Sequence, residues 1–407
     1  VAVGLDALTA NTTGAYNVAV GAATLDANTT ACYNTALGYI ALGVNTTGAS
    51  NTAIGTYSLR DNVTGSCNTA LGVAALRVTT ASNNVAVGTC SLYENTSGAN
   101  NAAVGVESMK FNTSGSTNSA FGNYALYSNT TASDNNAFGY NALGLNTTGT
   151  NNVAMGRNAL LNNTTASSNT AVGYNSLCAN TTGSANTAIG QAALDAITTG
   201  SSNTGLGSSA GTSITEGNNN LALGKSALVF TTTGDHNIAM GEDSVRCNTT
   251  GDYNIGIGVN ALHKNTASSN VGIGRNAASC TTTGALNVAL GDNALKANTT
   301  ANHNTAIGAQ TLQANTTGYA NTAVGYNALC THTTGNSNTA VGDNTMKLTT
   351  TGTFNVAIGD NALCANTTAS ENIAIGRNTM FANTTGTENT AVGSEALDSN
   401  TTASENT

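Results

Sequence analysis

NTAIGAQTLQANTTGYA, residues 304–320, is one complete copy of a phrase that fills this 407-residue sequence. Its opening, Asn-x-Ala/Gly-apolar-Gly, recurs from NVAVG at 17–21 to NTAVG at 389–393, and successive copies start 17 residues apart. Two steps are one residue shorter: Asn68 to Asn84 and Asn254 to Asn270. A short fixed period is typical of solenoid proteins, in which each repeat forms one turn of a coil.

The composition also argues against ordinary globular domains. The chain has no Pro and no Trp, and only 8% of its residues are charged, so large aromatic and aliphatic clusters are scarce. Thin stacked layers need only one or two large apolar residues each. We therefore expect residues 1–407 to form a single continuous repeat array. Because the sequence begins and ends within a copy, we expect this array to be a window of a longer fibre without its caps.

Each repeat is numbered here from its Asn, which is position 0. Position 3 is a large apolar residue in every copy, such as Leu37, Phe121 and Ile257; position 4 is always Gly, and position 8 is nearly always Leu or Met. Positions 11–14 usually read Asn-Thr-Thr-Gly or Asn-Thr-Thr-Ala, residues that favour turns. The Gly density and the missing 3.6-residue period exclude a helix. The sequence therefore predicts an all-β, parallel β-solenoid with about 17 residues per turn and about 24 turns.

Strand alternation predicts which side chains lie inside the coil. Positions 1 and 3 point to one side of a strand, and positions 2 and 4 point to the other. We expect the large residue at position 3 to meet the Leu of position 8 inside. Positions 2, 4 and 7, which carry only small residues, would then form a bare strip, and strand glycine often marks the close approach of another backbone. The strip would pack against identical chains, most simply around a threefold axis; the alternative is a solvent-facing surface of small residues.

Asn fills position 0 in all complete copies, from Asn17 to Asn389. One interpretation is a ladder of side-chain amides that hydrogen-bond from turn to turn, as in stacked β assemblies. The other is a row of ligand-binding groups. A binding site rarely needs the same residue in every turn, so the ladder is favoured.

The repeats carry a family resemblance. NTAVGYNAL at 321–329 and NTAIGAQTLQANTTG at 304–318 resemble repeats of tail-fibre-like proteins of phages and bacteria. They are also similar to the head repeats of trimeric autotransporter adhesins, which share the Asn-x-Ala-Ile/Val-Gly core but have a shorter period. The resemblance covers the whole chain. It implies a left-handed β-roll, a homotrimer and an extracellular, cell-surface or virion location. It also implies attachment to a host receptor through a tip that this stretch does not contain.

Sixteen turns contain the Asn-x-Ser/Thr acceptor sequence for N-linked glycans, which could sheathe the coil in a secretory setting. The Thr-Thr pair nevertheless persists where the Asn is replaced by Val78, Ile197 or His332, which turn geometry explains and glycosylation does not. The candidate glycosylation residues are Asn11, Asn28, Asn45, Asn62, Asn95, Asn112, Asn129, Asn146, Asn163, Asn180, Asn248, Asn298, Asn315, Asn366, Asn383 and Asn400.

The threonine rows raise a further hypothesis, because regular threonine ladders on flat β-solenoids can bind ice. Here the two Thr residues are adjacent, so in an extended strand they would point to opposite faces. They also fall in a turn bounded by Gly instead of a flat strand, which disfavours ice binding.

No catalytic constellation is evident. Glu371, Glu388 and Glu405 share position 16 in consecutive turns, and Asp235 and Asp252 share position 15. Stacking would place such carboxylates about 5 Å apart, the separation that retaining glycosidases use. Neither an aromatic platform nor a pocket-forming insertion accompanies them, so we predict that the protein is not an enzyme.

No cofactor or metal site is predicted either. The four His show no ligand spacing with one another or with the eight Cys. Cys330 and Cys364 share position 9 but lie two turns apart, roughly 9–10 Å, which exceeds disulfide reach. The 11 scattered Lys and Arg argue against nucleic acid as a partner, and no apolar run is long enough to span a membrane.

The sequence therefore favours a structural shaft of an extracellular or virion fibre, a rigid spacer whose identical chains associate as a trimer or fibril. The alternatives are a surface fibril that carries glycans on its Asn-Thr-Thr turns and an ice-binding solenoid that uses its Thr rows.

Overall fold

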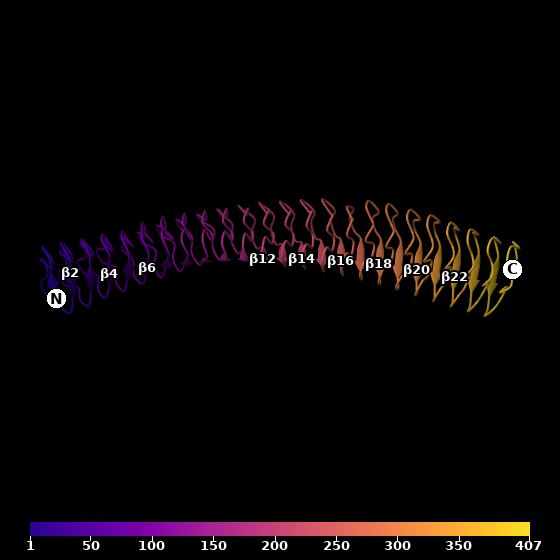
Figure 1. The fold of residues 1–407 in the computed structure, drawn as a ribbon, viewed down its shortest axis with the longest axis horizontal. Coiled ribbons are helices and arrows are strands. Elements are labelled where there is room, and N and C mark those ends of the chain that lie inside the picture. The colour runs from indigo at the N-terminus through magenta and orange to yellow at the C-terminus, as the bar shows by residue number, and fades with distance from the viewer. The chain divides into compact units, whose positions relative to one another are not determined.

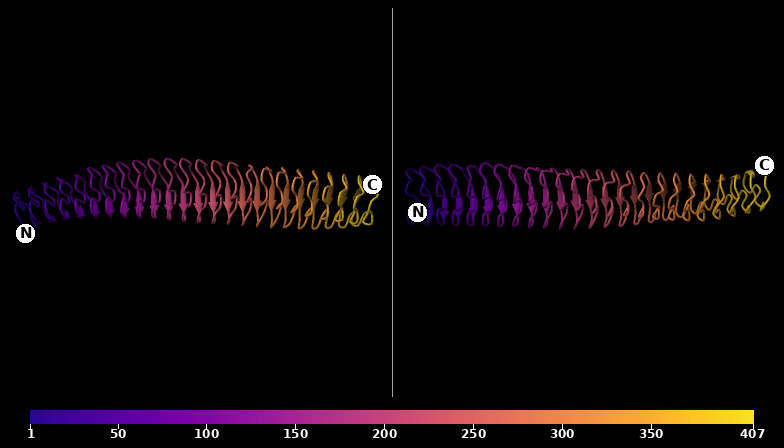
Figure 2. Two further views of the ribbon diagram at one scale, coloured as in Figure 1. Left: turned by 45° about the horizontal axis from the view of Figure 1, so that its top comes forward. Right: turned by 90° about the horizontal axis from the view of Figure 1, so that it is seen from above.

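The computed structural model describes residues 1–407, and its secondary structure consists of 24 short parallel strands without a helix. The first strand has two residues, and every other strand covers positions 1–3 of a repeat. Each strand pairs in register with a strand one repeat away, so that Val18 lies opposite Thr35 and Ala19 opposite Ala36. Within each of the two compact units described below, the strands lie side by side along one side of the coil (Figures 1 and 2). The predicted parallel β-solenoid, with strands about 17 residues apart, is confirmed.

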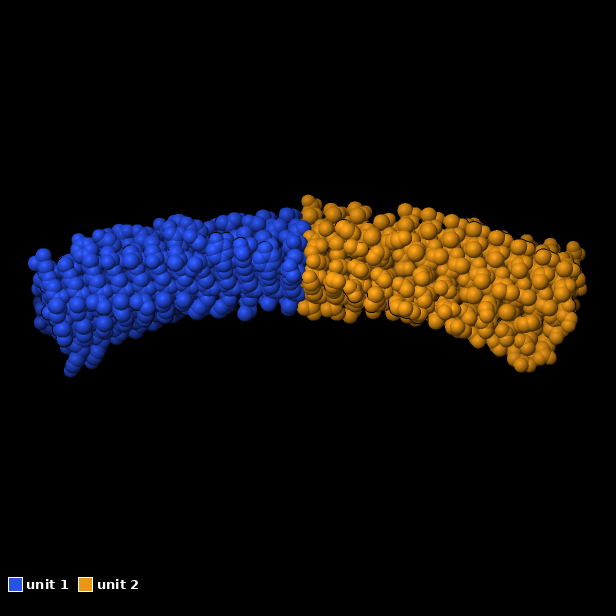
Figure 3. Space-filling view, in the orientation of Figure 1, with its two compact units in different colours: residues 1–202 blue, residues 203–407 orange.

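The chain divides into two compact units, residues 1–202 (unit 1) and residues 203–407 (unit 2), which are coloured separately in Figure 3. Unit 1 contains β1 (Ala2–Val3), β2 (Val18–Val20), β3 (Thr35–Leu37), β4 (Thr52–Ile54), β5 (Thr69–Leu71), β6 (Val85–Val87), β7 (Ala102–Val104), β8 (Ser119–Phe121), β9 (Asn136–Phe138), β10 (Val153–Met155), β11 (Thr170–Val172) and β12 (Thr187–Ile189). Unit 2 contains β13 (Thr204–Leu206), β14 (Leu221–Leu223), β15 (Ile238–Met240), β16 (Ile255–Ile257), β17 (Val271–Ile273), β18 (Val288–Leu290), β19 (Thr305–Ile307), β20 (Thr322–Val324), β21 (Thr339–Val341), β22 (Val356–Ile358), β23 (Ile373–Ile375) and β24 (Thr390–Val392).

Backbone hydrogen bonds also join the turns outside the strands. The Leu42 N–H donates to the Ser58 carbonyl of the next turn at 3.0 Å, and the Thr96 N–H donates to the Thr113 carbonyl at 3.0 Å. Bonds at position 6 run in the opposite direction, from the Tyr57 N–H to the Tyr39 carbonyl of the preceding turn at 3.0 Å. Each turn is therefore bonded to its neighbours on every side of the coil, which makes the stack stiff.

The predicted orientation of the strands is wrong. Ala at position 2 is completely buried, as is Leu at position 8, whereas the large residue at position 3 points outward; the Leu37 side chain is 46% exposed. The reason is the narrowness of the coil. A Cβ at Gly272, position 2, would lie 2.9 Å from Cγ of Leu262, position 8, so the strand rests directly on that leucine. Only Ala or Gly fits between them, and a second large column has no space inside.

The bare strip is not an open surface, because positions 2 and 7 are buried and the position-4 glycines are half-buried. Gly38, at position 4, has a φ of 140°, and a Cβ there would lie 2.6 Å from the carbonyl oxygen of Gly55 in the next turn. Position 4 is thus Gly because its own chain stacks so closely. At position 7 the Thr24 side chain is buried, and its hydroxyl donates to the Gly38 carbonyl at 2.7 Å. The proposed packing of this strip against identical chains is therefore excluded.

Positive φ angles recur at positions 6, 8 and 16 and explain part of the repeat. Leu59, at position 8, has a φ of 48°, and Asn141, at position 6, has a φ of 56°. Asn tolerates this left-handed region better than most residues, which accounts for its frequency at position 6. Leu does not, so burial of its side chain in every turn must offset a local backbone cost of about 1–2 kcal/mol.

Candidate functional site

The outer face of the sheet carries a column of large apolar side chains in both units. At position 3, Met155 is 46% exposed and Ile189 is 40% exposed. The rings of Phe121 and Phe138 stack on neighbouring strands with centroids 4.9 Å apart and planes 2° from parallel. Other position-3 residues exposed to a similar or greater degree are Leu71, Leu206, Leu290, Ile358, Ile375 and Val392. An apolar column of this length is unusual on a monomeric soluble protein.

The residues at position 1 extend this apolar face. They are mostly Thr, Val, Ile or Leu, and Val85, Val288 and Ile373 are exposed. Neither position 1 nor position 3 carries a charged residue in any turn. This face could therefore pack against another apolar surface without the cost of burying a charge.

The predicted ladder at position 0 is confirmed. The Asn34 backbone N–H donates to Oδ1 of Asn17 at 2.9 Å, and Nδ2 of Asn34 donates to the Gly48 carbonyl of its own turn at 2.9 Å. The same pair of bonds recurs along both units, and Asn34 is completely buried. Each position-0 side chain therefore satisfies a backbone donor of the next turn and a carbonyl at position 14. The arrangement leaves no side-chain group free for a ligand row.

A second amide ladder occupies position 11, where the candidate glycosylation residues lie. In Asn129, Nδ2 donates to Oδ1 of Asn112 at 2.7 Å and to the Ala132 carbonyl at 3.0 Å. The side chains of 14 of the 16 candidates are completely buried, and only Asn11 and Asn400, in the terminal turns, are partly exposed. Glycosylation itself stays a prediction, but a glycan on a buried Nδ2 would have to replace these bonds and leave the interior.

The position-11 ladder is interrupted where another residue replaces Asn. Oδ1 of Asn62, Asn180 and Asn315 has no hydrogen-bond partner, and the next turn carries Thr79, Ile197 and His332, respectively. In the shorter repeat Thr79, and not Val78 as predicted, replaces the Asn, because its hydroxyl lies 3.4 Å from Nδ2 of Asn95. Oδ1 of Asn366 also has no partner, although Asn383 follows it. His332 is completely buried; its Nε2 lies 2.7 Å from the Gly335 carbonyl, and its Nδ1 has no partner. Burial lowers the pKa of His332, because the charged imidazolium would lose its hydration.

The two Thr rows have different roles. At position 12 the Thr130 hydroxyl donates to the Thr147 carbonyl of the next turn at 3.0 Å, and this bond recurs along the chain. At position 13 the side chain, for example that of Thr148, is exposed. The two 16-residue repeats lack position 13, since Asn68 and Asn254 bond to the carbonyl 13 residues ahead instead of 14. The outer Thr row is therefore interrupted at these turns.

The structure places the stacked acidic residues in two different surroundings. The Asp252 carboxylate accepts a hydrogen bond from the Asp235 backbone N–H at 2.8 Å. Ser66 performs the same task at position 15, where its hydroxyl accepts from the Ala49 N–H at 3.0 Å. The acidic residues at position 15 thus belong to the hydrogen bonding between turns. Glu371, Glu388 and Glu405 are exposed.

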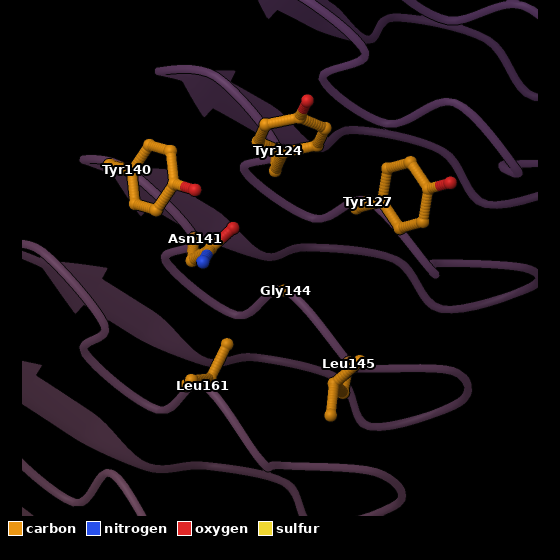
Figure 4. A pocket seen from close by; sticks show the side chains of 7 residues that line it. All are labelled: Tyr124, Tyr127, Tyr140, Asn141, Gly144, Leu145 and Leu161. Atoms are coloured by element: carbon orange, nitrogen blue, oxygen red, sulfur yellow. The ribbon is translucent and has the colours of Figure 1, made fainter.

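Aromatic side chains gather on a lateral face of unit 1, which the sequence analysis did not foresee. Tyr124, Tyr127 and Tyr140 surround a cavity of about 370 Å³, with Leu145 and Leu161 on its other side (Figure 4). Asn141 and Gly144 complete the lining. The signal lies in the repeat: aromatic residues recur at positions 5, 6, 9 and 10 of consecutive turns, and Gly144 interrupts position 9 between Tyr127 and Leu161.

All eight cysteines are free thiols. Burial raises the pKa of the Cys178, Cys330 and Cys364 thiols, so the reactive thiolate form is disfavoured there. The structure contains no group of three or more His, Cys, Asp or Glu side chains that could hold a metal ion.

No protein-family model matches the sequence, and no curated protein is significantly similar to it. The structure has no helix that combines the length and the apolar character needed to cross a membrane.

Proposed function

We propose that the protein is a structural shaft of an extracellular or virion fibre, a rigid spacer with no enzymatic activity. The observation that carries this proposal is the combination of a uniformly bonded coil with an outward apolar column in each unit. Stacked backbone bonds and two amide ladders give stiffness. The resemblance to tail-fibre and adhesin-head repeats supports the location and the role in attachment.

Identical chains are the partners that this surface fits best. With roughly 50 Å² of exposed apolar side chain per turn, the position-3 residues of one unit contribute roughly 600 Å². Position 1 brings the face close to the roughly 800 Å² per partner that a standard stable interface buries. Two or three uncharged, regularly spaced faces can pack sheet against sheet, as β-sheets do in sandwiches. The chains of a trimer or fibril would thus meet through positions 1 and 3.

Sedimentation analysis of a charged variant tests this assembly. Replacing Met155, Val172 and Ile189 with Lys places three charges on the sheet face of neighbouring turns. The matched control places Lys at the exposed position 13 of the same repeats, at Thr165, Thr182 and Thr199. We expect the unaltered protein and the control to sediment as oligomers, and the sheet-face variant to sediment as a single chain with an unchanged β-sheet circular dichroism spectrum. A single-chain mass for the unaltered protein at micromolar concentration would refute the proposal.

Ice binding is the second candidate, and the exposed position-13 Thr row is the observation that favours it. Its readout is thermal hysteresis of the unaltered protein and of the Thr165, Thr182 and Thr199 control variant. Thermal hysteresis that is present in the unaltered protein and lost in this variant would favour ice binding. Absence of thermal hysteresis in the unaltered protein would rule it out.

The glycan-bearing fibril is the remaining alternative, and its most accessible acceptors are Asn11 and Asn400. The mass of the protein after secretion from a eukaryotic host tests it directly. An increase confined to these two residues would agree with their exposure, and glycans along the whole ladder would contradict the buried position-11 amides.

A further inference from the structure

The cavity of unit 1 exists because one side chain is missing from a column. Position 9 carries Tyr127, Gly144 and Leu161 in three consecutive turns. Gly144 does not have a positive φ, and a Cβ there would lie 3.1 Å from the flexible end of Leu161 and 3.3 Å from the Asn141 carbonyl oxygen. The turns on either side carry full side chains at the same position, so the backbone conformation does not require glycine. In Figure 4 the open space lies directly over Gly144, between the rings and the two leucines. The gap is therefore a feature of the surface and not of the fold.

The walls of this cavity are aromatic rings held at fixed angles. Tyr124 lies edge-to-face with Tyr127, with ring centroids 5.7 Å apart, and with Tyr140, with centroids 5.8 Å apart. Phe111, in the neighbouring turn, packs edge-to-face against Tyr127, with ring centroids 4.9 Å apart. Such contacts restrict ring motion before a ligand arrives, which reduces the entropy lost on binding.

Polar groups suited to an uncharged ligand surround the same space; in Figure 4 the Tyr140 hydroxyl and the Asn141 side chain lie toward its centre, and the Tyr124 and Tyr127 hydroxyls lie at its outer edge. The three tyrosine hydroxyls can donate and accept, and the Asn141 carboxamide provides two donors and an acceptor. None of these side-chain groups makes a hydrogen bond within the chain. Figure 4 shows the Asn141 side chain between Tyr140 and Tyr124, on the cavity side of both.

Charge excludes two other ligand classes. The Arg157 guanidinium already lies over the Tyr140 ring, 5.7 Å from its centroid, and Lys110 lies 5.8 Å from the Tyr127 centroid, so a cationic ligand would meet two cations. An anion would find no charged side chain in the lining: Lys110 is paired with Glu107 at 3.0 Å, and the Arg157 guanidinium lies against the Tyr140 ring. A neutral ligand remains.

We propose that this cavity binds a neutral sugar ring of a saccharide. A pyranose has an apolar C–H face that can lie against a tyrosine ring, and hydroxyl groups at its rim that can bond to the tyrosine hydroxyls and to Asn141. The site is open on one side, so the rest of an oligosaccharide stays in water. The site gives the shaft a lateral contact with saccharides that does not depend on the assembly proposed above.

Two variants and one matched control test the proposal. Gly144→Leu fills the gap with the residue that position 9 already carries at Leu161, and Tyr140→Ala removes an exposed wall. Tyr174→Ala removes a tyrosine of similar exposure that does not line the cavity. The probes are cellohexaose, maltohexaose and mannohexaose as neutral saccharides, tetramethylammonium as a cation and toluene as an apolar ligand. Binding is followed by saturation-transfer NMR and by titration calorimetry.

We expect at least one neutral hexasaccharide to bind, with at least tenfold weaker binding to Gly144→Leu and Tyr140→Ala and unchanged binding to Tyr174→Ala. Circular dichroism of all three variants should match that of the unaltered protein. Absence of binding by all three hexasaccharides overturns the proposal. Equal loss in Tyr174→Ala, or binding of only tetramethylammonium or toluene, overturns it as well.

Discussion

The two units differ most in the ladder at position 11. In unit 1, Asn occupies this position in 10 of 12 turns, and eight bonds link the amides of successive turns. In unit 2, Asn occupies seven of 12, and only two such bonds form. Each unit nevertheless forms the same kind of coil. The position-11 ladder is therefore an accessory that the fold can lose in several turns.

The ladder at position 0 shows no such difference, because it is complete in both units. Its Oδ1 accepts from a backbone N–H, as in the bond from Asn220 to Asn203 at 3.0 Å. The amides at position 11 bond to one another and to a carbonyl that position 0 also serves. Losing position 0 would therefore leave a buried backbone donor unpaired, while losing position 11 leaves only a side-chain carbonyl oxygen without a partner, as at Asn62 and Asn180.

The largest effect is expected for Asn135→Ala, at position 0 of unit 1. This change removes the acceptor of the Asn152 backbone N–H, now bonded at 3.0 Å, and one donor to the Gly149 carbonyl. We expect a loss of about 3 kcal/mol in the local free energy of opening, from an unpaired buried donor and a small void. Native-state hydrogen exchange of the neighbouring turns measures it. Unchanged protection of Asn152 would show that position 0 is as dispensable as position 11.

For His332→Asn in unit 2 we expect a smaller change in the local free energy of opening, and a gain instead of a loss. The new amide would donate to the Gly335 carbonyl and supply a partner for Oδ1 of Asn315, which has none. We expect a gain of about 1–2 kcal/mol, the value of satisfying a buried acceptor. Hydrogen exchange around residues 315–349 provides the measurement. A loss of protection would mean that the imidazole packs better than the amide it replaced.

The smallest effect on stability at neutral pH is expected for Asn146→Ile in unit 1. The chain already holds Ile197 and Ile214 at this position, both completely buried. The Gly149 carbonyl keeps its bond from Asn135, whereas Oδ1 of Asn129 loses its donor. Nδ2 of Asn163 loses one acceptor but keeps its bond to the Ala166 carbonyl. Burial of the larger apolar side chain offsets part of that cost, so the change should be below about 1 kcal/mol. If Asn146→Ile lowers amide protection in hydrogen exchange as much as Asn135→Ala does, the position-11 ladder is as important for stability as the position-0 ladder.

The repeat period was sufficient to predict the coil, the parallel pairing and the position-0 ladder. It was not sufficient to orient the strand, because alternation assigns residues to two faces without saying which face is inside. We placed the larger residues inside, as is usual in a sheet-based core. In this coil the Leu42 side chain of position 8 fills the interior, and Ala36 is the largest residue that fits opposite. A second strand column of Val or Ile would need a wider turn.

The cavity was missed for a different reason. Acidic residues share one repeat position in consecutive turns and are therefore visible as a pattern in the sequence. The aromatic residues change position from turn to turn, so the sequence shows no comparable pattern for them. Tyr124 and Tyr140 occupy positions 6 and 5, and they meet only because the turns stack. The relevant signal was a glycine, Gly144, at a position where the backbone does not need one.

The pH dependence of the local stability of unit 2 provides a finer test of the position-11 ladder, at the turn where His332 replaces Asn. The pKa of His332 lies below its ordinary value near 6.5 in the folded chain, because burial disfavours the imidazolium. As the pH falls below about 6.5, the unfolded chain binds a proton that the folded chain resists, so the folded state loses stability. His332→Asn removes this effect while leaving every carboxylate in place. The local stability difference between the two proteins, measured by hydrogen exchange at matched pH, should therefore widen from pH 7.5 to pH 5.5. A constant difference would mean that His332 titrates alike in the folded and unfolded chain, and is not enclosed as the structure has it.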